Sequence, residues 1–315
     1  MKEPFFIVGC GRSGTTLLKS ILSAHPDLFP MPETFFFRSI LPRVAHHEKA
    51  PWKAIDSWWM ADMGVTPRSI KPFVERRLDE GRSTECALLV AVFDFHSAKN
   101  PGKAIGEKTP NHINHLGAIR TCFPDAPVIQ IVRDPRAVLA SFRKVKVGSN
   151  AVSDIVNEWS SAIDVLNHWC GTEGFLSIRY EDLVENPEGT LKQVCQTLGV
   201  RWSSEVLEFH RRRETGFAPE QAHHANTLRA LFRGSLESWR NEISGTDVAL
   251  VEWALRDEML NHGYAPDGDE VRAPNLRMAL SRTSGQVHRF LVRVPRQLLK
   301  ALKARRRQAR DLSKQ

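Results

Sequence analysis

Several features common in other protein classes are missing from this 315-residue sequence. No run of about 18 apolar residues occurs, so the sequence predicts no membrane-spanning helix. Its five cysteines are scattered and form no C-x-x-C pair, which argues against a disulfide framework and against a zinc site. We therefore expect a reducing, cytoplasmic location, with every cysteine acting as a small buried apolar residue.

Closely spaced metal ligands are also missing. The twelve histidines and the cysteines do not group with acidic residues at the spacing of a zinc or calcium site. The pairs His46-His47 and His223-His224 are more typical of exposed polar residues than of ligands. The sequence therefore predicts chemistry without a metal.

A net positive charge is present in only one segment of the chain. The chain has a net charge of +8, yet residues 271–315 alone hold thirteen Lys or Arg and a single acidic residue, Asp311. The rest of the chain is slightly acidic, so we expect no nucleic-acid-binding surface on the body. We expect residues 266–315 to form a basic, partly helical tail after a domain over residues 1–265. The tail composition favours an anionic membrane surface as partner, and a helix packed on the body is the alternative.

Apolar patterns along the chain alternate between strand and helix types. Short apolar runs predict strands at residues 5–8, 103–106, 128–132 and 175–178. Helical spacing predicts helices near residues 15–24, 66–81, 135–146, 152–170, 187–198 and 247–262. Strands that alternate with helices indicate a three-layer α/β domain with a central parallel sheet flanked by helices.

A glycine-rich loop separates the first predicted strand from the first predicted helix. Glycines permit a tight turn, so that backbone N–H groups and the positive end of the helix face an anion. Four hydroxyl or guanidinium side chains add further donors. The candidate phosphate-binding residues are Gly11, Arg12, Ser13, Gly14, Thr15 and Thr16. The sequence thus predicts a P-loop-like domain, and an ordinary strand–turn–helix connection is the alternative.

The loop lacks the lysine with which other phosphate loops bind nucleoside triphosphates. Its spacing matches G-x-x-x-x-G-K-[ST], but Thr15 stands where the lysine belongs. That lysine contacts the β- and γ-phosphates in kinases and ATPases. A small-molecule kinase is therefore a weaker alternative than an enzyme that binds another phosphorylated donor.

A second strand–turn–helix segment carries Arg133 at its turn and Ser141 in its helix, eight residues later. Both side chains can bind one dianionic phosphate, and the arginine would make charge-assisted hydrogen bonds. A surface arginine and a helical serine that bonds to its own backbone explain this segment equally well.

Taken together, these segments resemble the sulfotransferases that use 3′-phosphoadenosine 5′-phosphosulfate (PAPS), from about Phe5 to Tyr264. Arg12-Ser13-Gly14-Thr15-Thr16 is similar to their 5′-phosphosulfate loop. The resemblance implies that Arg133 and Ser141 hold the 3′-phosphate and that Tyr180 lies near the adenine. It also assigns Arg233 and Gly234 to a late phosphate-binding loop. The match is closer to the glycan and tyrosyl-protein types than to the cytosolic phenol and steroid type.

The same resemblance indicates the catalytic residues. Glu33 stands where the glycan and tyrosyl-protein types have a catalytic glutamate, so it would be the general base. Gly106-Glu107-Lys108-Thr109-Pro110 resembles their lysine motif, so Lys108 would contact the oxygen between sulfur and phosphorus, with Arg12 as the third catalytic group. His112 is the rival base, because the cytosolic type uses a histidine close to this lysine.

The activity that the resemblance implies is transfer of a sulfuryl group from PAPS to a hydroxyl of a carbohydrate, lipid or small metabolite. We expect the acceptor to approach over residues 35–99, which show a less regular pattern than the rest of the domain. Aromatic residues at positions 35–37 and 58–59 would line the acceptor cleft, and core packing is the alternative explanation for them. A non-catalytic, membrane-associated nucleotide-binding module is the remaining alternative.

Overall fold

The computed structural model describes residues 3–145, 151–211, 234 and 236–267. The chain forms two compact units, which are described separately below. Unit 1 comprises Met1–Arg133 and Val165–Arg233, and unit 2 comprises Asp134–Asp164 and Gly234–Gln315. Arg233, His223-His224 and nearly all of the predicted basic tail lie outside the described residues. Within the described ranges, no helix has the length and apolar character needed to cross a membrane.

Unit 1 is built on a five-stranded parallel sheet with the strand order β2-β3-β1-β4-β5. The strands are β1 (Phe5–Gly9), β2 (Leu28–Met31), β3 (Ala104–Lys108), β4 (Val128–Val132) and β5 (Phe175–Arg179). Every residue of β1, β3 and β4 is buried, as expected of central strands with both faces covered. The parallel sheet confirms the predicted fold class.

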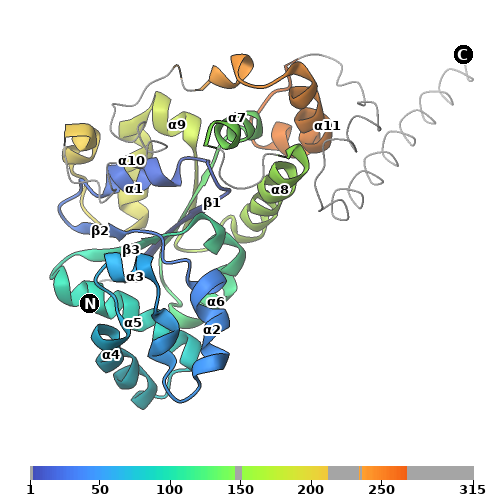
Figure 1. Ribbon diagram of the computed structural model, residues 1–315. Coiled ribbons are helices and arrows are strands. Elements are labelled where there is room, and N and C mark those ends of the chain that lie inside the picture. The colour runs from blue at the N-terminus through green and yellow to red at the C-terminus, as the bar shows by residue number, and fades with distance from the viewer. Residues whose placement is uncertain (1–2, 146–150, 212–233, 235, 268–315) are drawn as a thin grey trace, which may run out of the picture. The chain divides into compact units, whose positions relative to one another are not determined.

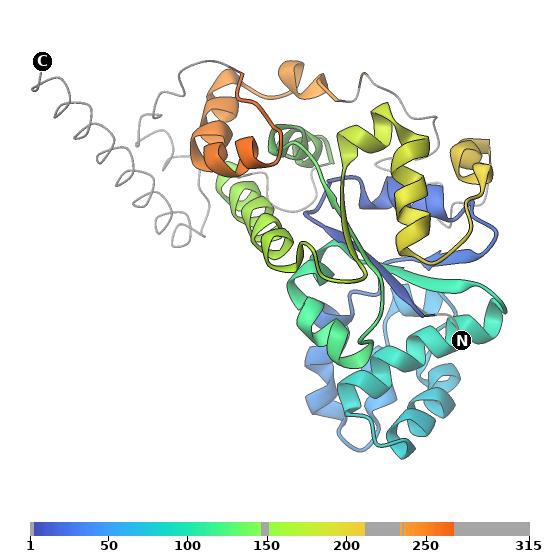
Figure 2. The ribbon, with the colours of Figure 1, turned by 180° about the vertical axis from the view of Figure 1, so that it is seen from behind.

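Helices cover both faces of this sheet, as Figures 1 and 2 show from opposite sides. One face packs against α1 (Thr15–Leu22), α9 (Tyr180–Glu185) and α10 (Pro187–Thr197). The other face packs against α5 (Thr84–Lys99) and α6 (Leu116–Cys122), where Phe6 of β1 meets the rings of Phe93 and Phe123 at 5.3 and 6.0 Å. The result is the three-layer arrangement that the strand–helix alternation predicted.

Residues 35–99 are more regular than the sequence indicated. After β2 they form η1 (Phe36–Ile40), α2 (Leu41–Val44), η2 (Ala45–His47), η3 (Pro51–Ile55), α3 (Trp58–Asp62), α4 (Pro67–Asp79) and α5. The predicted start of α4 is confirmed, because Thr66 and Ser69 cap it reciprocally. The remaining helices are α7 (Pro135–Val145), α8 (Val152–Trp169), η4 (Pro110–His115), η5 (Ser204–Arg211), η8 (Ser238–Asn241) and α11 (Gly245–Asn261).

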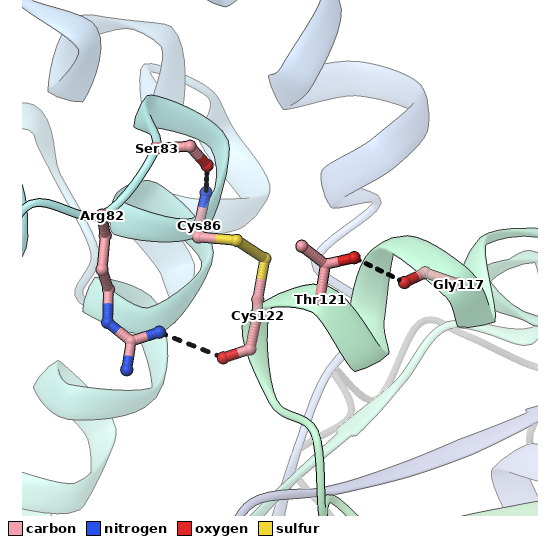
Figure 3. Close-up of a disulfide and its surroundings, with 6 residues drawn as sticks. All are labelled: Arg82, Ser83, Cys86, Gly117, Thr121 and Cys122. Carbon is pink, nitrogen blue, oxygen red and sulfur yellow. Dashed lines mark hydrogen bonds between the residues drawn. A yellow bond between two sulfur atoms is a disulfide. The ribbon is translucent and has the colours of Figure 1, made fainter.

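The expectation that the cysteines form no disulfide is wrong. Cys86, near the start of α5, is bonded to Cys122 at the end of α6 (Figure 3). Ser83 caps α5 by accepting a hydrogen bond from the Cys86 N–H, and Arg82 donates to the Cys122 carbonyl at 3.1 Å. The 36-residue separation gave no signal, because only the packing of α5 beside α6 brings the two sulfurs together. Cys10 and Cys195 are buried as expected, whereas Cys170 is exposed.

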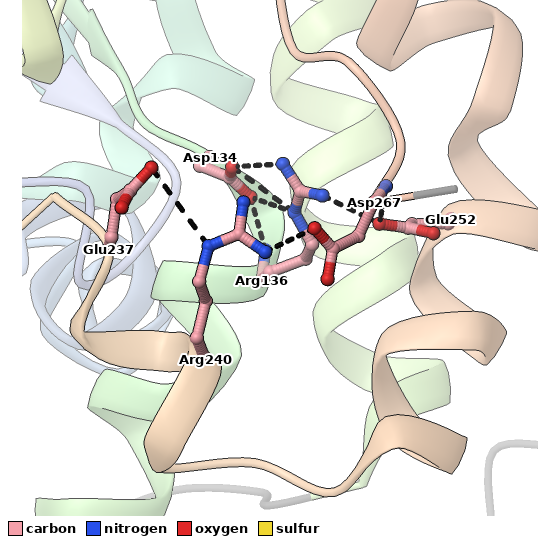
Figure 4. Close-up of polar contacts among 6 residues, drawn as sticks. All are labelled: Asp134, Arg136, Glu237, Arg240, Glu252 and Asp267. Carbon is pink, nitrogen blue, oxygen red and sulfur yellow. Dashed lines mark hydrogen bonds and ion pairs between the residues drawn. The ribbon is translucent and has the colours of Figure 1, made fainter. Parts of the chain in front are cut away.

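Unit 2 contains a buried network of paired charges (Figure 4). The Arg136 guanidinium donates to both oxygens of Asp134, at 2.7–3.2 Å, and to Glu252 on α11 at 2.6 Å. The Trp239 ring of η8 lies 4.2 Å from this guanidinium and 4.6 Å from that of Arg240, which also pairs with Asp267. Each buried charge in this network therefore has an opposite charge beside it.

Candidate active site

The unit 1 candidates all lie at the carboxyl ends of the parallel strands. The phosphate loop follows β1, Glu33 follows β2, Lys108 is the last residue of β3, Arg133 follows β4 and Tyr180 follows β5. These ends meet at one edge of the sheet, and strand order reverses at β1, between β3 and β4. Open α/β sheets bind their ligands at such a reversal. The fold thus gathers residues that are up to 169 positions apart in the chain.

The phosphate loop is held tightly against β4 and α9. Gly9 has φ +154°, and a Cβ there would lie 2.5 Å from the Ile131 carbonyl oxygen. A Cβ on Gly14, which has φ +107°, would lie 2.6 Å from the Tyr180 ring. Arg12 also adopts a left-handed conformation, with φ 65°. Only glycine fits these two positions, which explains the pattern seen in the sequence.

Donors in this loop are left available to an anion. Helix α1 begins at Thr15, and its N-cap residue Gly14 provides no side-chain cap. The Ser13 side chain is fully buried, and its hydroxyl has no hydrogen-bond partner among the described residues. A buried hydroxyl without a partner is costly, and the start of a helix favours negative charge. Both features fit a bound phosphate or sulfate group.

Lys108 links the loop to Glu33. Its side chain is only 2% exposed, and its Nζ donates to Thr16 Oγ1 at 3.2 Å and pairs with the Glu33 carboxylate. Glu33 keeps 29% of its side chain exposed. The sequence-predicted base and leaving-group cation are therefore in direct contact, beside the second threonine of the loop.

Cations outnumber carboxylates in this cluster. Arg12, Lys19, Lys108 and Arg133 interact electrostatically with one another or with a single carboxylate, Glu33. Burial and the neighbouring Arg133 lower the pKa of Arg12, although Glu33 opposes this shift. Burial and Lys108 lower the pKa of Lys19 to about 8, again against Glu33. Holding like charges close together raises the free energy of the folded protein, and a bound anion would offset this cost.

Lys19 was not identified from the sequence. It lies on α1, three and four residues after Thr16 and Thr15, and is only 3% exposed. Residues at these spacings share one face of a helix, and long side chains lean toward the helix start. A lysine one turn after a phosphate loop was the available signal.

Arg133 and Tyr180 close the other side of the loop. The Arg133 guanidinium lies 4.2 Å from the centre of the Tyr180 ring, within the range of a cation–π contact. One of its nitrogens also lies 3.5 Å from the Arg12 carbonyl oxygen. Tyr180 is 8% exposed and packs on Gly14, so the predicted adenine residue touches the predicted phosphate loop.

The remaining nucleotide candidates are placed differently. Ser141 lies half-buried on α7 and Gly234 is exposed, both in unit 2, and Arg233 lies outside the described residues. Arg133 belongs to unit 1. The joint grip of Arg133 and Ser141 on a 3′-phosphate therefore stays a prediction.

The rival base, His112, is held by another carboxylate. It is 1% exposed, and its Nδ1 lies 2.9 Å from Glu107 Oε2. The Phe37 ring meets the imidazole edge-on at 5.0 Å. Because Nδ1 faces the Glu107 carboxylate, Nε2 is the nitrogen that remains for proton transfer.

The aromatic residues expected near the acceptor divide into two groups. Phe36 and Phe37 are buried and belong to the core. Phe35 and Trp59 are half-buried and meet edge-on at 6.1 Å, and the Trp59 indole donates to the Thr34 carbonyl at 3.2 Å. Trp58 is 73% exposed. Exposed Trp58 therefore directly precedes Trp59, whose indole contacts the residue after Glu33.

Comparison with known proteins agrees with this geometry. Protein-tyrosine sulfotransferase A of Caenorhabditis elegans is 27% identical over 216 residues, 65% of this chain and 52% of that protein. Protein-tyrosine sulfotransferase 2 of Gallus gallus is 29% identical over 211 residues, 64% of this chain and 52% of that protein. The chain thus spans about half the length of these relatives.

Two solved structures share the fold at low identity. The sulfotransferase domain of the Synechococcus PCC 7002 olefin synthase matches with TM-score 0.56 and 19% identity, covering 80% of this chain and 95% of that domain. The sulfotransferase domain from the curacin biosynthetic pathway also gives TM-score 0.56, with 18% identity, covering 81% and 98%. The sulfotransferase family profile itself matches residues 4–204, which include the phosphate loop, Glu33, Lys108, Arg133 and Tyr180. The chain belongs to the sulfotransferase family.

Proposed function

We propose that this chain transfers the sulfuryl group of PAPS to a hydroxyl of an acceptor. The observation that carries the proposal is the cluster of four cations around Glu33 at the carboxyl edge of the sheet. PAPS carries a 5′-phosphosulfate and a 3′-phosphate, so it supplies several negative charges to one compact site. The unpartnered hydroxyl of Ser13 and the Gly9 and Gly14 cradle favour a phosphate group in the loop.

The residues have distinct roles in this proposal. Arg12, Ser13, Gly14, Thr15 and Thr16 hold the 5′-phosphosulfate. Lys108, bound to Thr16, stabilises the charge that develops on the oxygen between sulfur and phosphorus as the S–O bond breaks. Glu33 accepts the proton of the attacking hydroxyl, and the acceptor oxygen forms the new bond to sulfur.

In the Glu33–Lys108 pair, the lysine would act on the PAPS donor and the glutamate on the acceptor hydroxyl. In the free protein the lysine pairs with the Glu33 carboxylate. When PAPS supplies its own negative charge, Lys108 gains a second anionic partner. Glu33 remains partly exposed, which leaves its carboxylate accessible to an acceptor.

The acceptor is proposed to be a hydroxyl compound. Two of the relatives are named for protein tyrosine, so a tyrosine-containing peptide is the first acceptor to try. A carbohydrate, a lipid and a small metabolite complete the panel. Trp58 is an exposed aromatic residue that contacts Trp59, and Trp59 donates to the carbonyl of Thr34, the residue after the base.

The test is transfer of label from ³⁵S-labelled PAPS to this panel. We expect incorporation into one class of acceptor by the unmodified protein and none by Lys108→Met. Absence of transfer to every acceptor, together with tighter binding of ATP–Mg²⁺ than of adenosine 3′,5′-bisphosphate, would overturn the proposal in favour of a kinase. Binding of the bisphosphate without any transfer would favour the non-catalytic module.

The basic tail supports a separate proposal of peripheral binding to an anionic membrane surface. Its support is compositional, since residues 268–315 lie outside the described structure. We expect the protein to pellet with anionic but not neutral liposomes, and to be released by salt. Equal pelleting after deletion of residues 271–315 would show that the tail is not the anchor.

A further inference from the structure

A second carboxylate, Glu107, lies beside the proposed catalytic pair and has no assigned role. It precedes Lys108 on β3, and its side chain is completely buried. A buried carboxylate needs hydrogen-bond donors to offset its desolvation. Its donors come from the segment that carries Glu33 and from the segment that follows Lys108.

Thr34 is the first of these donors. Its backbone N–H and its hydroxyl both donate to Glu107 Oε1, at 3.1 and 3.0 Å. Glu33, which precedes Thr34, pairs with Lys108, which follows Glu107. Two consecutive residues after β2 are therefore fastened to the last two residues of β3, which continues the strand pairing of Met31 with Glu107.

Phe35 shows that this segment is held under constraint. It has φ 50°, a left-handed conformation that is unfavourable for a bulky side chain. Its N–H donates to Thr109 Oγ1 at 3.4 Å, and Thr109 in turn donates to Glu107 Oε1. The Phe36 N–H donates to Thr34 Oγ1 at 3.3 Å. Glu107 is thus the common anchor of the turn that follows Glu33.

The second oxygen of Glu107 faces His112 at 2.9 Å. Burial by itself would raise the pKa of Glu107, but His112, Thr109 and Thr34 outweigh burial and hold the pKa below its usual value. Glu107 therefore stays ionised and acts only as an acceptor of hydrogen bonds. A protonated carboxyl would lose part of this set of bonds.

We propose that Glu107 is a positioning residue that fixes Glu33 against Lys108 through Thr34, with His112 orienting the Glu107 carboxylate. This rests on the proposed function, because Glu33 must be the base for its position to affect turnover. Small displacements of a reacting group lower rates strongly, by up to about 10²-fold for a shift near 1 Å. Binding of the nucleotide does not depend on Glu107, which contacts no residue of the phosphate loop in the hydrogen bonds described above.

A double-mutant cycle with Glu33 separates positioning from a general structural role. We expect Glu107→Gln to lower kcat by about 10–100-fold, with the affinity for adenosine 3′,5′-bisphosphate changed less than about threefold. In a Glu33→Gln background the same change should lower kcat no further, because the base it positions is already absent. Losses that multiply in the double variant would overturn the proposal.

Thr34 provides a milder version of the test, in case Glu107→Gln does not fold. Thr34→Val removes the hydroxyl donor and keeps the shape, so kcat should fall by about tenfold, and Thr34→Ser should restore it. Thr190→Val is the matched control, because the buried Thr190 hydroxyl donates to the Asp182 carbonyl at 3.1 Å, away from the site. An unchanged kcat in Thr34→Val, or an equal loss in Thr190→Val, would contradict the proposal.

Hydrogen exchange provides a readout that does not require activity. The amides of residues 33–36 should lose protection in Glu107→Gln or Thr34→Val and keep it in Thr190→Val. Normal protection in the first two variants overturns the positioning role even when no acceptor is known. Failure of the unmodified protein to bind adenosine 3′,5′-bisphosphate or to transfer label overturns the proposed function instead, so the two failures are distinguishable.

Discussion

Two clusters of buried charge, one in each unit, are built in opposite ways. In unit 2 the buried Arg136 is matched by Asp134 and Glu252, and these partners raise its pKa against the effect of burial. In unit 1 Arg12 and Lys19 have other cations as neighbours, and the pKa of each is lowered. The same residue types thus form a network of opposite charges in one unit and a cluster of neighbouring like charges in the other.

The pairing of charges distinguishes a structural network from a ligand-binding site, without reference to any relative. A network of paired charges is complete in the protein alone, whereas a cluster of like charges is completed only by a ligand of opposite charge. The unit 1 cluster also includes the helix start and the unpartnered Ser13 hydroxyl, which favour the same kind of ligand. Charge changes in the unit 1 cluster should therefore alter binding and turnover, and loss of a cation there should stabilise the free protein. Charge changes in the unit 2 network should destabilise it.

The largest expected effect concerns the single carboxylate of the cluster. Glu33→Gln should lower kcat by about 10²–10⁴-fold, because the general base is lost, while nucleotide affinity stays nearly unchanged. Glu188→Gln is the control, since this glutamate forms an exposed pair with Lys192 on α10. Near-normal turnover in Glu33→Gln, with loss of turnover in His112→Ala, would transfer the role of base to His112.

In unit 2 a comparable change should act on the free energy of unfolding. Arg136→Met leaves Asp134 and Glu252 without their cation, so we expect a loss of about 3–5 kcal/mol in chemical denaturation. Lys144→Met should cost less than about 1 kcal/mol, because its pair with Glu242 is solvent-exposed. Similar losses in the two variants would show that the buried network is no more important than a surface pair.

Removing a unit 1 cation should stabilise the free protein. The folded state disfavours protonated Lys19, whose pKa is lowered from 10.5 to about 8, so its penalty is full below pH 8 and vanishes as the pH rises to 10.5. Lys19→Met should therefore be more stable than the unmodified protein at pH 7, by as much as about 3 kcal/mol. The difference should shrink between pH 8 and pH 10.5. Denaturation across this range tests it, with Lys192→Met as the exposed control, and a pH-independent difference would be inconsistent with it.

The smallest expected effect concerns nucleotide choice. Arg133→Ala should remove about 1.5–3 kcal/mol of the preference for adenosine 3′,5′-bisphosphate over 5′-AMP, which is the strength of a hydrogen bond to a charged group. Arg120→Ala should leave the preference intact, because Arg120 donates to the Pro124 and Glu173 carbonyls instead. A preference that survives Arg133→Ala would remove this residue from the 3′-phosphate site.

Local sequence patterns predicted most of the strands and the phosphate loop but not the contacts between distant residues. Strands β1 and β4 are short apolar runs, and the loop glycines are required by their positive φ angles. β2 was missed because it is only four residues long and contains Pro30. Helix α5 was missed because eleven of its sixteen residues are buried around its whole circumference, which leaves no helical periodicity to detect.

The candidate site shows the same limit. Glu33 and Lys108 were chosen from their motifs, and their direct contact follows from the pairing of β2 with β3. The role of Glu107 depends on burial and on neighbours that are distant in the sequence, so no local pattern could assign it. Lys19 offered only its position one turn after the phosphate loop, and its proximity to Lys108 depends on the fold. The Cys86–Cys122 disulfide was missed for the same reason.

Calorimetric titration of the unmodified protein with adenosine 3′,5′-bisphosphate, 5′-AMP and ATP–Mg²⁺ tests the role of the unit 1 cations most directly. We expect the bisphosphate to bind far more tightly than the other two, with uptake of protons above pH 8 that disappears in Lys19→Met, because an anion raises the pKa of a nearby lysine. Equal binding of the bisphosphate and 5′-AMP, or a preference for ATP–Mg²⁺, would contradict the assignment of this cluster to PAPS.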